Sequence, residues 1–246
     1  MHGPIIDLMA QCGILKPSKY SNFIMSLLKQ YWEVPVFIVF ALFCVTFPQV
    51  DIWITQLFYV EGEGFPLNDN PVVQVIYVIF RYIPALLIPV MLLMLAAPWF
   101  IKRLQGTRKY TTFLLLALLI GPGIIVHPVL KDNWDRPRPR DVQEFGGQYD
   151  FQPAFIPAEN GGKNKSFASG HGAMGFYFMA FAWVFRKRRL FVAGLIVGTI
   201  VSLGRIVQGG HFFSDVATAG FIVYFTCQAL SYWLLGHRRI KESKTV

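Results

Sequence analysis

Long apolar segments dominate this chain and limit what it can fold into. Six of them are separated by polar stretches, and they run over about 32–49, 72–100, 110–130, 169–185, 190–208 and 213–235. Each is compatible with the roughly 20 residues that a helix needs to cross a hydrocarbon core. The hydrophobic content of 54% and the mean hydropathy of +0.45 exceed what a soluble core requires. The sequence therefore predicts an all-α, polytopic membrane protein with six transmembrane helices in a bundle and a long outer loop.

The basic residues indicate how such a bundle is oriented. Lys and Arg gather near the N-terminus, at 102–109, at 186–189 and in the C-terminal tail, and six crossings place all four groups on one side. By the positive-inside rule that side is the cytoplasm, so we expect both termini inside and the loop 131–168 outside. We expect one integral membrane domain over 1–246, in which 1–31 is a cytoplasmic amphipathic approach. The frayed first turns of helix one explain that stretch equally well.

Composition also excludes some classes of protein. The formal net charge of +9 could suggest nucleic acid, yet no basic stretch is interleaved with aromatic residues that would stack on bases, so no such partner is expected. Cys12, Cys44 and Cys227 are isolated, which fits neither a disulfide framework nor a zinc site. No clustered carboxylates or closely spaced histidines offer a metal site, so we expect neither a metal nor another cofactor.

Two histidines lie where apolar segments meet polar ones. His171 opens the fourth segment, and His211 lies four residues before Asp215 at the start of the sixth. Three cationic side chains fall on the same outer side of the bundle: Lys131, Arg138 and Arg205. Cations offset the charge of a phosphate, one imidazole can attack phosphorus, and another can protonate the departing oxygen. The sequence therefore predicts a metal-independent phosphoryl-transfer site at the membrane interface.

The spacing of these residues resembles the signature of the type 2 phosphatidic acid phosphatase superfamily. The matching segments are KDNWDRPRP at 131–139, ASGH at 168–171 and GRIVQGGHFFSD at 204–215. Ala168 stands where Pro is usual, and Gly204 stands where Ser is usual, but neither change removes a charge or an imidazole. The resemblance covers about 85 residues directly and implies a six-helix core.

The resemblance also implies a role for each residue of the site. His211 would attack phosphorus and form a phosphohistidine, Asp215 would hold its other ring nitrogen, and His171 would protonate the leaving alkoxide and then activate water. The implied phosphate-binding residues are Lys131, Arg138, Ser169, Gly170 and Arg205. Ser169 and Gly170 could also simply cap a helix, and Lys131 taken alone would be explained by snorkelling to lipid headgroups.

The outer loop carries the information on substrate. Its stretch RPRDVQEFGG at 138–147 resembles that of bacterial members that act on lipid A or similar glycolipids. Four basic residues are candidates for headgroup contacts, although a balanced, solvated loop explains them equally well: Arg136, Arg140, Lys163 and Lys165.

Two polar residues lie inside the apolar segments. We expect Arg81 to pair with an acidic residue of the first outer loop (Glu61, Glu63 or Asp69), with substrate contact as the second interpretation. We expect His127 to be a core histidine.

The expected function is dephosphorylation of a membrane lipid phosphate, monoester or diphosphate, at the periplasmic face of a bacterial inner membrane. Lipid A is the first expected substrate, and undecaprenyl diphosphate and phosphatidylglycerol phosphate are alternatives. Transfer of the phosphoryl group to a second lipid fits the same intermediate. A non-catalytic membrane scaffold or lipid transporter is the alternative from another class, and the intact His171, His211 and Asp215 argue against it.

Overall fold

The computed structural model describes residues 30–240, so the expected approach segment 1–31 lies almost wholly outside the described residues. The chain divides between residues 43 and 44 into two compact units. The first contains most of α3 (Glu33–Thr46), an apolar helix with many exposed large side chains. Within 30–240 the regular elements are all helical and the only β pairing is two isolated bridges, which confirms the all-α class.

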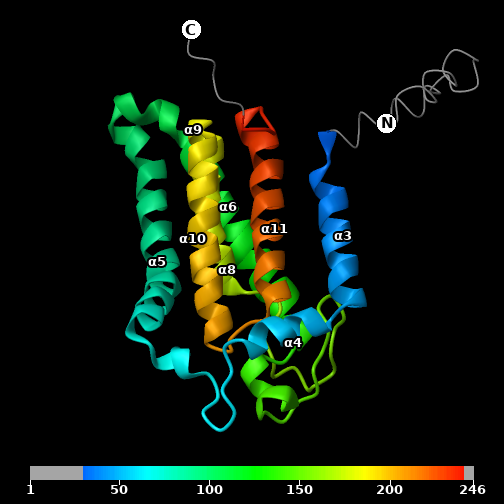
Figure 1. The fold of residues 1–246 in the computed structure, drawn as a ribbon. Coiled ribbons are helices and arrows are strands. Elements are labelled where there is room, and N and C mark those ends of the chain that lie inside the picture. Colours follow the sequence, from blue (N-terminus) through cyan, green and yellow to red (C-terminus); the bar gives the residue numbers. More distant parts are fainter. Residues whose placement is uncertain (1–29, 241–246) are drawn as a thin grey trace, which may run out of the picture. The chain divides into compact units, whose positions relative to one another are not determined.

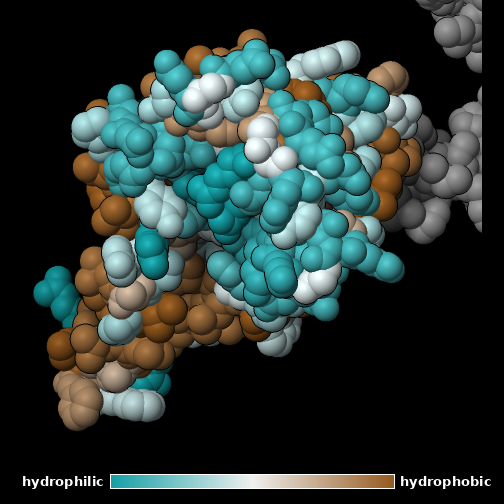
Figure 2. Space-filling model, turned by 90° about the horizontal axis from the view of Figure 1, so that it is seen from below, coloured by the Kyte–Doolittle hydropathy of each residue, from teal (hydrophilic) through white to brown (hydrophobic). Residues whose placement is uncertain are grey.

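The second unit consists mainly of long helices that run alongside one another (Figure 1). In chain order its main helices are α4 (Gln49–Gln56), α5 (Pro71–Phe100), α6 (Arg108–Leu118), η3 (Leu119–Lys131), α8 (Gly170–Phe176), α9 (Ala180–Phe185), α10 (Arg188–Val207) and α11 (Phe213–Leu230). The short α4 lies across one end of this unit, and the polar loops 57–70 and 132–169 lie at the same end. Hydrophilic side chains cover most of that end, with hydrophobic ones along one margin (Figure 2).

Helices occupy all six expected apolar segments, but fewer of them can cross a membrane unaided. Four helical stretches are long and apolar enough: 71–100, 102–141, 188–207 and 213–235. A fifth is added if α3 and α4 together form one bent span. The stretch 170–185 is divided into α8, η6 (Tyr177–Met179) and α9, each too short to count. The described residues thus give four or five candidate spans, and six crossings stay a prediction.

The helix expected over 110–130 changes its winding halfway. Beyond α6 it continues as η3, a π-helix of 13 residues that contains Pro122 and Pro128. Proline has no backbone N–H and its ring clashes with the carbonyl four residues back, which disfavours the α-helical pattern and favours a wider turn. Because η3 ends at Lys131, this winding determines where the lysine ammonium group lies.

Glycines allow α8 and α10 to pack closely. A Cβ atom on Gly198 would lie 2.1 Å from Cδ1 of Phe176, and one on Gly172 would lie 3.2 Å from Oγ of Ser202. Small residues of this kind let two helix backbones approach each other, as is common between helices in membranes. The contact brings the start of α8 beside the end of α10, and these are two of the helix ends that carry the sequence motifs.

Large apolar side chains are found both inside and outside the second unit. Phe113 and Tyr177 are fully buried, whereas Leu93 on α5 is 70% exposed and Trp99 is 74% exposed. Soluble monomers rarely expose large apolar patches. This distribution is typical of helices whose outer faces contact lipid.

Candidate active site

The sequence motifs meet at the loop-bearing end of the second unit. Lys131 ends η3, His171 lies in the first turn of α8, and Arg205 lies in the last turn of α10. His211 lies in the turn before α11, whose first turn contains Asp215. Lys131 and Arg205 both lie close enough to the two imidazoles for their positive charges to interact with them. Four helices therefore bring two histidines and at least two cations into one site.

The imidazole of His211 and the carboxylate of Asp215 face each other inside the protein. His211 Nδ1 lies 3.6 Å from Asp215 Oδ2, and the two side chains are only 2% and 0% exposed. Asp215 Oδ2 also accepts hydrogen bonds from Ser166 Oγ at 2.6 Å and from the backbone N–H of Phe212 at 2.9 Å. Because Nδ1 faces the carboxylate, Nε2 on the far side of the ring is the nitrogen available for chemistry.

Burial keeps the His211 ring uncharged. Removal from water lowers the pKa of His211 to about 3; the nearby Lys131 and Arg205 lower it as well, while Asp215 opposes them. A lowered histidine pKa means that the neutral, nucleophilic form persists well below neutral pH. The resting state of this side chain is therefore the form that can attack phosphorus.

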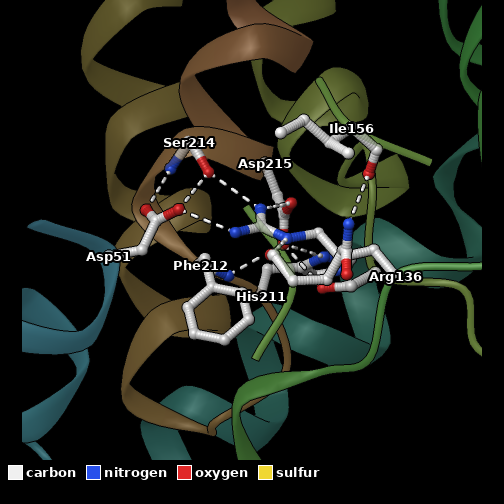
Figure 3. Close-up of polar contacts among 9 residues, drawn as sticks. Asp51, Arg136, Ile156, His211, Phe212, Ser214 and Asp215 are labelled. Atoms are coloured by element: carbon white, nitrogen blue, oxygen red, sulfur yellow. Dashed lines mark hydrogen bonds and ion pairs between the residues drawn. The ribbon is translucent and has the colours of Figure 1, made fainter. Parts of the chain in front are cut away.

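Arg136 differs from its expected role as a headgroup contact. Its side chain is fully buried, and Nη1 lies 2.5 Å from Asp215 Oδ1 while Nη2 lies 2.8 Å from Asp51 Oδ2 (Figure 3). Its Nε donates to the carbonyl oxygen of Gln152 at 2.8 Å. A buried guanidinium that is paired with two carboxylates does not reach a lipid headgroup, and removing a carboxylate partner from such a buried charge is strongly destabilising.

Sequence reasoning did not single out Tyr77, which contacts both His171 and Arg205. The rings of Tyr77 and His171 stack with centroids 4.6 Å apart at 16°. The guanidinium carbon of Arg205 lies 4.8 Å from the centroid of the same tyrosine ring. Within an apolar segment a tyrosine carries no signal that distinguishes this role from contact with lipid.

Several buried nitrogen atoms of the site have no hydrogen-bond partner among the described residues. They belong to Arg138 (Nε), Arg205 (Nε) and His171 (Nε2). A buried donor left without a partner costs about 1–3 kcal/mol. Oxygen atoms of a bound phosphate would satisfy such donors, which suits an anion-binding site.

Gly210 gives the Arg205 side chain its space. A Cβ atom on Gly210 would lie 2.3 Å from Nη2 of Arg205. The guanidinium also donates a hydrogen bond to Gln208. Together these contacts hold Arg205, which is 8% exposed, in one orientation.

Ser169 and Gly170 occupy the N-terminal end of α8. The Ser169 hydroxyl accepts a hydrogen bond from the backbone N–H of Gly172 at 3.1 Å, so it caps the helix. A Cβ atom on Gly170 would lie 2.9 Å from His127 Nε2 and 3.5 Å from Lys131 Nζ. The absence of a side chain at Gly170 is what lets these two basic groups come close to α8.

A cavity of about 270 Å³ opens beside His171. Lys131, His127 and Arg81 supply its basic groups, and α5, α6, η3 and α8 supply its apolar wall. Arg81 does not form the expected ion pair with the acidic residues of the first outer loop; among the described residues it contacts the Tyr82 ring, with Cζ 5.7 Å from the centroid. The cavity position favours the second interpretation of Arg81, substrate contact.

The other headgroup candidates lie on the loop surface. Arg140 is half-exposed, with its Nε 3.9 Å from Asp141 Oδ1, and its backbone N–H donates to the carbonyl oxygen of Gly209 at 3.2 Å. Lys163 is exposed. Lys165 forms an exposed ion pair with Asp132 at 2.6 Å, a contact that contributes little free energy in water. Within 30–240 no group of three or more His, Cys, Asp and Glu side chains is placed to hold a metal ion.

Comparison with known proteins places this geometry in context. The family model described as the PAP2 superfamily matches residues 110–239. The lipid A 4'-phosphatase of Francisella tularensis subsp. novicida (strain U112) is 36% identical over 191 residues, which cover 75% of this chain and 86% of that protein. The lipid A 4'-phosphatase of Rhizobium leguminosarum is 31% identical over 192 residues, covering 69% and 81%. That of Rhizobium etli (strain ATCC 51251 / DSM 11541 / JCM 21823 / NBRC 15573 / CFN 42) is 30% identical over 189 residues, covering 69% and 73%. No solved structure matched the chain.

Proposed function

Because this chain belongs to the PAP2 superfamily, we propose that it is a lipid A phosphatase that hydrolyses the 4'-phosphate monoester through a phosphohistidine. The observation that carries the proposal is that His171, His211 and Asp215 lie together inside the matched region of a chain whose curated relatives are lipid A 4'-phosphatases. The described helices have the apolar outer faces that an enzyme acting on a membrane lipid needs.

In the first half-reaction the neutral His211 attacks. Its Nε2 forms a bond to phosphorus while the bond from phosphorus to the lipid oxygen breaks. His171, whose protonated form is favoured by the negative charge of the bound phosphate, donates a proton to that departing oxygen. The ring of His211 becomes positively charged, and Asp215 stabilises it through Nδ1. Lys131, Arg138 and Arg205 bind the three non-bridging oxygens and offset their charge as it redistributes.

In the second half-reaction water replaces the lipid oxygen. His171, which has lost its proton, now removes one from water, and the resulting oxygen nucleophile attacks the phosphohistidine. The bond from phosphorus to Nε2 breaks, inorganic phosphate leaves, and both imidazoles return to their starting protonation states. Every charge-compensating group in this cycle is a side chain.

The cavity beside His171 is on the side where the leaving group departs. His211 and the departing oxygen lie on opposite sides of phosphorus in an in-line displacement, so the body of the lipid lies on the side of His171. The cavity offers basic groups near the reacting bond and an apolar wall beyond them. This arrangement suits a sugar phosphate that is attached to acyl chains.

We place the site at the periplasmic face of a bacterial inner membrane, with six crossings and both termini in the cytoplasm. The positive-inside distribution of Lys and Arg supports this orientation. The hydrophilic end that carries the loops would then face the periplasm.

The proposal is tested with the purified protein and bisphosphorylated lipid A in mixed micelles. We expect mass spectrometry to show the loss of one phosphate group from lipid A, with the remaining phosphate on the reducing-end glucosamine. The His211→Ala variant should release no phosphate. Undecaprenyl diphosphate and phosphatidylglycerol phosphate serve as competing substrates. Faster hydrolysis of either would replace lipid A as the substrate, and activity in His211→Ala would refute the phosphohistidine route.

A further inference from the structure

A buried carboxylate outside the family match is connected to the catalytic pair. Asp51 lies on α4, well before the matched region 110–239, and is 3% exposed. Its Oδ2 lies 2.8 Å from Arg136 Nη2, and its Oδ1 accepts a hydrogen bond from the backbone N–H of Ser214 at 2.9 Å (Figure 3). Oδ2 also accepts a hydrogen bond from the Ser214 hydroxyl. Burying a carboxylate is costly, and here Arg136 and Ser214 compensate part of that cost.

Arg136 is shared between this carboxylate and the catalytic one. One terminal nitrogen faces Asp51 and the other faces Asp215, and the guanidinium carbon lies 4.5 Å from the centroid of the Phe212 ring. The Ser214 hydroxyl accepts from Arg136 Nη1 at 2.8 Å and donates to Asp51, so it bridges the same two groups. The Arg136 and Asp215 side chains are both fully buried, so solvent screens their charges less than it screens charges at the surface.

The charges of this cluster have a consequence for His211. Two carboxylates and one guanidinium carry one net negative charge between them. If Asp51 were neutral, Arg136 would balance Asp215, and His211 would face a pair without net charge. The His211 imidazole gains a positive charge when it is phosphorylated. A cluster with one net negative charge favours that step, and an Arg136–Asp215 pair without net charge favours it far less.

We propose that Asp51 is a positioning residue that sets the charge of the Arg136–Asp215 pair, so that Asp215 keeps its power to stabilise the phosphorylated imidazolium of His211. The inference rests on the proposed phosphohistidine chemistry. It differs from a purely structural role, in which Asp51 would only fasten α4 to the start of α11 and any well-bonded replacement would serve.

The decisive variant is Asp51→Asn, which keeps the shape of the side chain but loses its charge. The amide oxygen can accept from Arg136 and the Ser214 hydroxyl, as Oδ2 does now, and only the hydrogen bond from the Ser214 N–H to Oδ1 is lost. Arg136 stays paired with Asp215 in this variant, so no charge is left unpaired and the fold is expected to survive. We expect kcat and the single-turnover rate of phosphohistidine formation to fall roughly tenfold to a hundredfold, the scale of one partly screened charge at several ångströms. KM should change less than about twofold, because no group that binds the phosphate is altered.

Two further variants separate charge from structure. Ser214→Ala removes the bridging hydroxyl but leaves all three charges, and it should stay within about threefold of the wild-type kcat. The double variant Asp51→Asn with Arg136→Gln restores one net negative charge, on Asp215 alone, and should be more active than Asp51→Asn. A structural role predicts the opposite order, because the double variant loses more of the network.

A wild-type kcat in Asp51→Asn, or a folded double variant no more active than Asp51→Asn, would overturn the inference. If Asp51→Asn does not fold, the double variant decides alone: kcat near the wild-type value supports the assignment, and kcat at least tenfold lower opposes it. A wild-type protein that releases no phosphate from any lipid would instead refute the proposed function, so the two failures are distinguishable.

Discussion

Tyr77 should be the most informative residue to change outside the sequence motifs. Its ring centroid lies 4.6 Å from that of the His171 imidazole and 4.8 Å from the guanidinium carbon of Arg205. Tyr77→Leu keeps an apolar side chain on α5 but removes both ring contacts. Tyr77→Phe keeps the ring and loses only the hydroxyl.

The size of the effect follows from the two contacts. A stacked ring pair contributes about 0.5–1.5 kcal/mol beyond its buried area. A cation over an aromatic face contributes about 0.5–2 kcal/mol. If both orient groups that act in the transition state, their loss raises the barrier by about 1–3.5 kcal/mol, which slows the reaction roughly fivefold to a few hundred-fold.

The measurement is phosphate release by the detergent-solubilised enzyme, expressed as kcat/KM, with thermal unfolding as the check on folding. We expect Tyr77→Leu to fall within the calculated range and Tyr77→Phe to stay within about twofold of wild type, because phenylalanine retains the ring face. Equal losses in the two variants would refute the reasoning, since the hydroxyl alone would then matter. So would full activity in Tyr77→Leu.

Four other outcomes are expected. Activity should survive EDTA because side chains supply the charge compensation, and loss restored by one divalent ion would contradict this. A cysteine at Gln148 should react with an impermeant maleimide in intact spheroplasts, and one at Gln105 only after lysis, in a background without native cysteines; the reverse pattern would exclude a periplasmic site. The ring nitrogens of His211, assigned by comparison with His211→Ala, should remain neutral in NMR spectra down to pH 5, because burial lowers the pKa of His211 to about 3; a titration near pH 6.5 would show a solvated ring. Gly204→Ala should raise the free energy of unfolding by about 0.5–1 kcal/mol with activity kept, since a Cβ atom there meets nothing within 4 Å, and a lower melting temperature would argue against it.

The helices could be predicted closely because apolar runs have a simple physical cause. The run 72–100 corresponds to α5 at Pro71–Phe100, and the run 213–235 corresponds to α11 with its extension η7 (Ser231–Leu235). The winding of η3 could not be predicted in the same way. Proline in an apolar segment indicates a disturbance of the helix, but not whether a kink, a break or a π-helix results.

The motif residues could be found because their chemistry is rare at the ends of apolar segments. The sequence shows Arg136 only as a basic residue of the outer loop. Its burial depends on Asp51, which lies 85 residues away in the chain. Nothing local in the sequence links the two. The surroundings of Arg81 could not be predicted either. A charge in an apolar segment needs compensation, which favours an ion pair, and the sequence does not show that Arg81 lines a cavity.

The contact between Asp51 and Ser214 has a consequence for biosynthesis. The two residues are 163 positions apart in the chain. At translation rates of about 5–20 residues per second, Asp51 is made about 8 to 30 s before its partner exists. During that time Asp51 can pair with Arg136 but has no Ser214 to bind, so the network around Asp215 is completed only once the start of α11 has been made. Nascent chains that stop before α11 would therefore contain the Asp51–Arg136 ion pair without Ser214 and Asp215, an incomplete network that distinguishes them from the finished enzyme.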